Sequence, residues 1–396
     1  MHDHAPSAPA RAEAGVRPPQ VADIFRRHGE AYLQDHRLSP GQAWVLLSMM
    51  ACRTSLLGGH LDVCPGCGYE RPSYNSCRDR HCPTCQGSQQ AAWIEGRLDR
   101  VVPTHHFHVV FTLPAPLRAL VLANQAILYD LLFAAATRTL LDLAADQWKA
   151  QPGITAVLHT WTRQMDFHPH LHCVVTGGGL STDGDRWVSC RQGFLFPICV
   201  LGSLFRGKFL DGLRRAAAAG ELRFVGGCAG LADPVAFRQL LDRLYKTPWV
   251  VFAKRPFGGP RQVIRYLGRY THRVAISSGR LLSVSDDRVA FKTKGERTCT
   301  LAPPEFIRRF LLHVLPKGFR KIRHYGLLAP ANVRTRLVTA QRLVALTADP
   351  TANRAAPTTS DAALPPDAPN LCPHCRSHEL RREVLPPRAR PPPEAG

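Results

Sequence analysis

Apolar and polar positions follow two different patterns between residues 100 and 335. Short runs rich in Val, Ile, Phe, Thr and Trp are typical of strands and predict them over 106–112, 154–162, 167–176 and 249–254. Longer stretches with helical character predict helices over 114–148, 203–219, 233–245, 260–272 and 304–315. Turn residues at 278–279 and 286–287 predict a β-meander over 273–293. Strands interleaved with helices predict one α+β domain over 100–335.

The remaining residues divide into three parts by composition. Residues 1–20 are polar and rich in Pro and Ala, and are expected to be disordered. Residues 21–95 begin with helices, one starting near Ser39-Pro40-Gly41, and become dense in Cys and His from 52 to 85. Residues 350–396 carry many Pro, Ala, Arg and Thr, so this tail is also expected to be disordered.

The longest apolar stretch, at about 117–145, is interrupted by polar and charged residues and is expected to be a soluble helix rather than a membrane span. The N-terminus lacks the apolar segment of a signal peptide, so the chain is expected to be cytoplasmic. The 13 cysteines should then be thiols or metal ligands rather than disulfides.

Charge indicates the class of partner. Lys and Arg total 51 against 30 Asp and Glu, a net charge of +21 over 396 residues. Such an excess favours a polyanionic partner, with nucleic acid as the first candidate and a membrane surface as the second. No basic amphipathic helix stands out as a membrane anchor. The segment PFGGP at 256–260 lacks the Lys-Ser/Thr and spacing of a phosphate-binding loop, so no nucleotide cofactor is expected.

Two C-x-x-C pairs, Cys64/Cys67 and Cys82/Cys85, predict a structural zinc site, because four thiolates suit the tetrahedral preference of Zn²⁺. Four more candidate ligands lie among them and leave room for a second zinc: Cys52, His60, Cys77 and His81. The alternative is that the extra cysteines are small core residues. A third pair, Cys372/Cys375 in the tail, has His374 and His378 nearby and is half of a possible site.

The strand FHPHLHCVVT carries three alternating histidines, which should share one face: His168, His170 and His172. They are either satisfied core histidines or metal ligands. The predicted helix at 260–272 carries Tyr266 and Tyr270 one turn apart. An arginine stripe runs beside them and is typical of phosphate binding rather than of an ion-paired surface: Arg261, Arg265, Arg269 and Arg273.

These two segments fit one chemistry. A tyrosine hydroxyl can attack a DNA phosphate and form a covalent ester with the 5′ phosphate, releasing a free 3′-OH. A divalent ion held by imidazoles polarises the scissile phosphate, and arginines offset its charge. Mg²⁺ or Mn²⁺ suits this role.

The segment HPHLHCVVTGGG resembles the His-hydrophobic-His (HUH) motif, and YLGRYTHRVAIS resembles the two-tyrosine motif of rolling-circle transposases. The segment from Cys52 to Cys85 resembles the zinc-binding domain of the same transposases, the insertion-sequence ninety-one type. The resemblance covers about residues 20–335 and keeps the order of the three motifs.

This resemblance implies a ferredoxin-like, antiparallel-sheet nuclease domain behind a small helical zinc-binding domain. It implies cleavage and joining of single-stranded DNA at element ends, with His170 and His172 as metal ligands and Tyr266 and Tyr270 as nucleophiles. A third metal ligand stays open among His159, the first choice, and His168 and Gln164. The alternatives are a replication initiator or relaxase with the same chemistry, or a zinc-dependent protein that only binds DNA.

Overall fold

The computed structural model describes residues 17–191, 193–254, 262, 268, 274–347 and 371–388, without the side chains of 87–89. The predicted helix at 260–272, with both tyrosines and the four arginines of the stripe, lies outside the described residues apart from positions 262 and 268. In the described part of the chain, no helix combines the length and apolar character that crossing a membrane requires.

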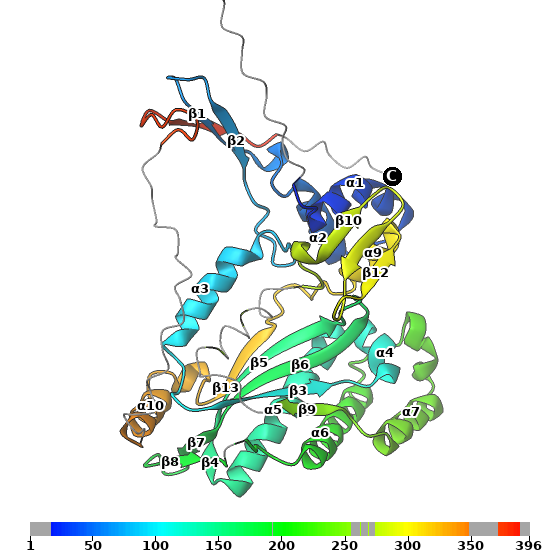
Figure 1. The fold of residues 1–396 in the computed structure, drawn as a ribbon. Coiled ribbons are helices and arrows are strands. Elements are labelled where there is room, and N and C mark those ends of the chain that lie inside the picture. Colours follow the sequence, from blue (N-terminus) through cyan, green and yellow to red (C-terminus); the bar gives the residue numbers. More distant parts are fainter. Residues whose placement is uncertain are drawn as a thin grey trace, which may run out of the picture.

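A five-stranded sheet forms the centre of the molecule (Figure 1). Its strands are ordered β13-β5-β6-β3-β9, and each neighbouring pair is antiparallel. The bounds are His106–Thr112 for β3, Gly153–Trp161 for β5, Phe167–Thr176 for β6, Val251–Lys254 for β9 and Ile322–Gly326 for β13. The four strands predicted from apolar runs are therefore confirmed, and the prediction of an α+β fold with an antiparallel sheet is confirmed with them.

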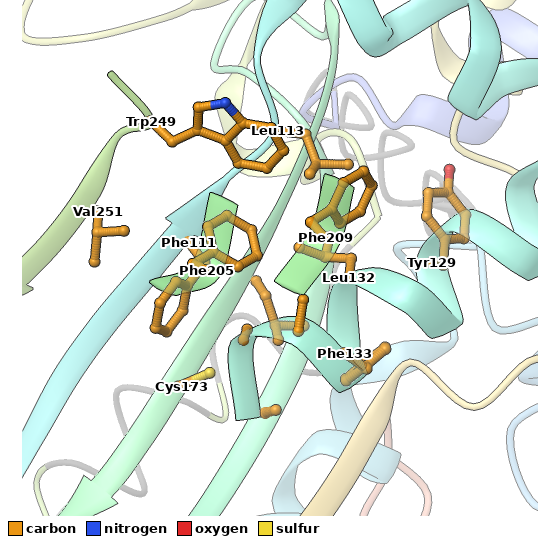
Figure 2. Close-up of a cluster of buried hydrophobic side chains, with 14 of the residues drawn as sticks. Phe111, Leu113, Tyr129, Leu132, Phe133, Cys173, Phe205, Phe209, Trp249 and Val251 are labelled. Carbon is orange, nitrogen blue, oxygen red and sulfur yellow. The ribbon is translucent and has the colours of Figure 1, made fainter. Parts of the chain in front are cut away.

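Helices cover one face of this sheet and bury the main core (Figure 1). They are α4 (Arg118–Ala123), α5 (Gln125–Gln147), α6 (Ile198–Ala218) and α7 (Pro234–Lys246). Phe111 of β3 lies edge-on to Phe205 of α6, with ring centroids 5.0 Å apart, and Trp249 lies 5.2 Å from Phe205 (Figure 2). Each buried aromatic side chain contributes about 1.5–3 kcal/mol, so this cluster fixes which sheet face meets the helices.

A second core joins the N-terminal helices to a late part of the chain. It is built from α1 (Val21–Asp35), α2 (Pro40–Ala51), α9 (Pro303–Leu311) and a small sheet of β10 (Leu281–Val284), β11 (Val289–Lys292) and β12 (Thr298–Leu301). Helix α2 starts at the predicted place, where the Ser39 hydroxyl accepts a hydrogen bond from the Gln42 amide at 3.3 Å. The predicted boundary near residue 95 therefore does not separate two independent cores.

The predicted meander over 273–293 is displaced along the chain, because its strands run from 281 to 301. Residues 274–276 instead contribute buried apolar side chains to the second core without forming a strand. The two predicted turns do flank β10, which is the first strand of the meander.

Part of the tail is ordered, which corrects the prediction of disorder for 350–396. Strand β14 (Arg381–Leu385) pairs with β1 (Gly59–Val63), which also pairs with β2 (Glu70–Tyr74). Apolar content alone did not indicate this strand, because its partner lies about 320 residues away in the chain. The rest of the described chain includes α3 (Gln86–Leu98), α10 (Arg336–Thr347) and a small sheet of β4 (Ala150–Gln151), β7 (Gly178–Ser181) and β8 (Trp187–Ser189).

Candidate active site

The histidine row lies on the sheet face opposite the main core. Along β6, Leu171 and Cys173 are buried among the helices, so the alternate residues His170 and His172 point to the other side. Helix α3 crosses this side (Figure 1), where its Trp93 packs with Val157 and Val174. The row is therefore partly covered by protein, with His170 and His172 half-buried, and it stays separate from the apolar core.

Three imidazoles converge on this face. His159 of β5 lies directly opposite His170 of β6, and His172 is the next residue on the same face. One ring nitrogen from each of the three residues lies within 4.8 Å of the other two. The structure thus places His159, the first choice for a third metal ligand, beside the predicted ligands His170 and His172. Gln164 is exposed in the turn between the strands, and His168 is not part of the group.

Hydrogen bonds orient two of these rings. The Nδ1 of His170 lies 2.6 Å from the carbonyl oxygen of His168, and a carbonyl can only accept, so this nitrogen carries the proton. The Nε2 of His170 then holds the lone pair that a metal needs. The Nδ1 of His172 lies 2.8 Å from the Nε2 of His108 on β3, which also leaves its other nitrogen to the group.

Burial keeps these rings neutral. Desolvation lowers the pKa of His170 to about 4 and lowers the pKa of His172 well below its usual value. Desolvation likewise lowers the pKa of His108 to about 4. Because neutral imidazole is the form that coordinates metal, protons do not compete for these nitrogens at pH 7. The donor set therefore fits a divalent ion, with His159, His170 and His172 as the residues that would hold it.

A positive charge lies at one end of the row. The Arg118 guanidinium donates to the Nδ1 of His168 at 3.3 Å, and the pKa of His168 is lowered by burial and by this neighbour. Lys254 of β9 lies opposite His108 in the sheet register. An anionic group that approached the imidazoles would meet these cations, which favours a phosphate over a neutral ligand.

The cysteines form two groups, but not the predicted ones. Cys82 and Cys85 lie with Cys52 and Cys77, whereas Cys64 and Cys67 lie with Cys372 and Cys375 of the tail. In the first group the Sγ atoms of Cys52 and Cys85 are 3.4 Å apart, and those of Cys77 and Cys85 are 3.5 Å apart. A tetrahedron with Zn–S bonds of 2.3 Å has edges of about 3.8 Å, so this spacing suits zinc, while a disulfide would need about 2.05 Å.

The predicted pairing of Cys64/Cys67 with Cys82/Cys85 is therefore wrong, because β2 and the loop after it separate the two cysteine pairs. The two histidines suggested for the second zinc also belong to neither group. His81 is held by the Asp79 carboxylate at 2.8 Å and accepts from the Leu315 amide at 3.3 Å. His60 lies on β1, opposite Ser73 and Val384.

The sequence matches two family models. The model described as "Putative transposase" matches residues 153–336, and the one described as "Transposase zinc-binding domain" matches residues 24–113. "Putative transposase y4qJ" of Sinorhizobium fredii is 50% identical over 319 residues, which cover 78% of this chain and 80% of that protein. The chain belongs to the transposases of the IS91 type.

More distant similarities are also found. "Transposase for insertion sequence element IS801" of Pseudomonas savastanoi pv. phaseolicola is 28% identical over 75% of this chain and 72% of that protein. Among solved structures, the conjugative relaxase TrwC in complex with mutant oriT DNA matches 41% of this chain and 71% of its own. Its sequence identity is 17% and its TM-score is 0.23.

Membership of this family establishes two properties of the chain. The transposase carries an N-terminal zinc-binding domain, and the cysteines within residues 24–113 support structural Zn²⁺ there. It acts on DNA, which agrees with its net charge of +21.

One residue near the candidate site escaped sequence reasoning. His108 belongs to the predicted strand at 106–112, and a histidine among apolar residues is most often a core residue. Its relation to His172 depends on the pairing of β3 with β6, which the sequence does not specify. The only signal was the alternation of His106 and His108, which repeats on β3 the pattern of the histidine row.

Proposed function

We propose that this transposase nicks and rejoins single-stranded DNA at the ends of a mobile element, through a covalent 5′-phosphotyrosine intermediate, in rolling-circle transposition. The observation that carries the proposal is the imidazole group of His159, His170 and His172 on the sheet face opposite the main core. Core histidines that only fill space would not need their ring nitrogens within 4.8 Å of one another.

The three imidazoles would hold Mg²⁺ or Mn²⁺. When bound, such an ion draws electron density from a non-bridging oxygen of the scissile phosphate and so favours nucleophilic attack. The protein's part is to keep the ligands neutral and oriented. The carbonyl of His168 fixes the ring of His170, and His108 fixes the ring of His172.

Tyr266 and Tyr270 are the proposed nucleophiles. A tyrosine oxygen would form a bond to phosphorus while the bond from phosphorus to the 3′ oxygen breaks. The phenolic proton is lost, and the departing oxygen gains a proton to become a free 3′-OH. Attack of a 3′-OH on the phosphotyrosine would rejoin DNA and restore the phenol. Two tyrosines would permit one strand to be held while a second is cut.

A contact at position 268, between the two tyrosines, supports this assignment. A Cβ atom built on Gly268 would lie 2.4 Å from side-chain atoms of Ile94, so the backbone there passes directly against α3. Helix α3 is also the helix whose Trp93 packs on the histidine face. Position 268 therefore lies against the helix that packs on the histidine face of the sheet.

The test uses 5′- and 3′-labelled single-stranded oligonucleotides from the element's ends, incubated with full-length protein and Mn²⁺ or Mg²⁺. Denaturing electrophoresis should show a protein–DNA adduct with the wild type. The double variant Tyr266→Phe/Tyr270→Phe should bind the oligonucleotide and form no adduct. The variant His170→Ala/His172→Ala should lose metal-dependent cleavage and keep its zinc.

A matched control is Tyr245→Phe, because Tyr245 is an exposed tyrosine on α7, on the other side of the sheet. It should form the adduct as the wild type does. An adduct formed by the double tyrosine variant would refute the nucleophile assignment. Cleavage that survives in the double histidine variant would refute the metal site.

A further inference from the structure

The C-terminal segment is built into the zinc-binding domain. Strand β14 adds to the edge of the β1–β2 hairpin, in a register that pairs Gly59 with Leu385 and Val63 with Arg381. The resulting order is β14-β1-β2, which places β1 in the middle (Figure 1). The family model of this domain ends at residue 113, so it does not include the third strand.

Two turns at one end of this sheet have the same backbone design. In the first, the Cys64 amide donates to the carbonyl of Tyr69 at 2.9 Å, and the Gly68 amide donates to the carbonyl of Cys64 at 2.9 Å. In the second, the Cys372 amide donates to Ser377 at 2.9 Å and the Arg376 amide to Cys372 at 2.8 Å. Each turn thus forms the same bonds at the same spacing.

The fifth residue of both turns has a left-handed backbone. Gly68 has φ of 69° and Arg376 has φ of 59°. A left-handed conformation costs a non-glycine residue about 1–2 kcal/mol, so Arg376 is held there by its surroundings. The turn at 372–377 therefore repeats the backbone geometry of the turn at 64–69, although an arginine favours the left-handed conformation less than a glycine does.

The four thiols of these turns face one another. The Sγ atoms of Cys64 and Cys375 are 3.6 Å apart, and those of Cys67 and Cys372 are also 3.6 Å apart. Both distances are close to the edge of about 3.8 Å expected for a tetrahedral zinc tetrathiolate. Each turn supplies two ligands, and neither turn alone completes the tetrahedron.

An ion-pair cluster fixes the same register from the middle of the sheet. The buried Asp62 on β1 accepts from Arg382 of β14 at 2.8 Å and from Arg71 of β2 at 3.3 Å. A buried carboxylate is costly unless it is paired, so these two arginines favour the register in which both outer strands are docked. This register is the one that brings the two cysteine turns to the same end.

We propose that Cys372 and Cys375 complete a four-cysteine zinc site with Cys64 and Cys67, so that one ion ties the C-terminal segment to the N-terminal hairpin. The zinc-binding domain then consists of two parts separated by the whole catalytic domain. The zinc held by Cys52, Cys77, Cys82 and Cys85 is a second, independent ion. Because structural zinc contributes folding free energy directly, the hairpin depends on a tail about 300 residues away.

The test is the zinc content of full-length variants, measured per chain by elemental mass spectrometry. Relative to the wild type, Cys372→Ser/Cys375→Ser should lose one zinc, and Cys64→Ser/Cys67→Ser should also lose one. The quadruple variant should again lose only one, because all four residues serve the same ion. Cys199→Ser/Cys299→Ser removes two cysteines that belong to neither group and should lose none.

Full zinc content in Cys372→Ser/Cys375→Ser would overturn the proposal, and so would loss of two ions in the quadruple variant. If the serine variants do not fold, a protease site inserted near residue 360 of the full chain gives a second measurement. After cleavage the tail fragment should stay bound during gel filtration and be released by a zinc chelator. A fragment that separates before chelation would also overturn the proposal. These readouts do not depend on nuclease activity.

Discussion

At the scale of single residues, the candidate active site depends on side chains that do not touch the metal position. His108 is the clearest case, because its Nε2 lies 2.8 Å from the Nδ1 of His172. In metal sites, a partner on the second ring nitrogen fixes the tautomer and the orientation of the ligand, and its loss typically lowers metal affinity by about 10–100-fold. His108 is thus a positioning residue for the proposed ion.

We predict that His108→Ala lowers the affinity of the histidine site for Mn²⁺ by about 10–100-fold. Titration calorimetry or the electron paramagnetic resonance signal of free Mn²⁺ would measure this change. His106→Ala is the matched control, since His106 is buried on the same strand face but its Nδ1 contacts the carbonyl of Thr104 at 2.9 Å. Equal effects of the two substitutions would show that His108 acts only through packing.

At the scale of elements, local patterns in the sequence predicted the strands and the face on which their side chains lie. Apolar runs predicted β3, β5, β6 and β9, because a strand buried on its core face needs such residues. The alternation in β6 predicted that its histidines share a face, and His159 followed from its place on the preceding strand. These inferences need only the period of a strand and the antiparallel pairing of neighbours.

Contacts between distant segments could not be predicted in the same way. The spacing of two C-x-x-C pairs suggested one site, but the cysteine pairs close their sites with other partners. Cys52 is supplied by the end of α2, and Cys372 by a tail whose proline content suggested disorder. The cysteine motifs correctly predicted a zinc-binding domain. The partners of Cys64 and Cys67 depend on strand pairing across more than 300 residues, which the motifs do not encode.

The docking of the tail can be tested at the turn before β1. Gly58 has φ of 64°, and a Cβ atom there would lie 2.6 Å from the carbonyl oxygen of Leu385 and 2.8 Å from the nitrogen of Pro387. Gly58→Ala should therefore combine a backbone cost of about 1–2 kcal/mol with a clash against the tail. We expect a larger loss of thermal stability than the backbone cost alone would cause.

Gly295→Ala is the control for this prediction. Gly295 has φ of 65°, and a Cβ atom there meets nothing within 4 Å among the described residues. The two variants share the backbone cost, so the difference between their unfolding free energies isolates the contact with the tail. Similar losses in both variants would mean that the tail moves away from residue 58 without cost.

At the scale of the whole molecule, the proposed catalytic site and the proposed zinc sites lie on different sheets. The imidazole group is part of the central sheet, whereas the zinc-binding sheet is separate from it. The helices α4 to α7 pack on one face of the central sheet (Figure 1), and the imidazoles occupy the other. The sheet β14-β1-β2 lies beyond α3 (Figure 1), and α3 is the helix whose Trp93 packs on the imidazole side of the central sheet. A DNA strand that reaches the imidazoles would therefore approach from the side that carries the zinc-binding domain.

Net charge contributes to the strength of DNA binding. The effect of where the positive charge lies can be separated from the effect of how much of it there is. Each phosphate contact on single-stranded DNA adds about 0.7 to the slope of the logarithm of the binding constant against the logarithm of salt concentration. If the arginine stripe binds the DNA backbone, Arg265→Ala/Arg269→Ala should lower the slope by about 1.4, twice this value. Fluorescence anisotropy at several salt concentrations measures the slope.

Arg214→Ala/Arg215→Ala removes the same charge from a different place. Both arginines lie on α6 and pair with Asp211, at 2.8 and 3.1 Å, on the helical side of the sheet. Because the two double variants have equal net charge, long-range attraction is reduced equally in both. The slope of the α6 variant should stay close to that of the wild type. A decrease of the same size in both would mean that overall charge, and not the stripe, determines how this transposase holds DNA.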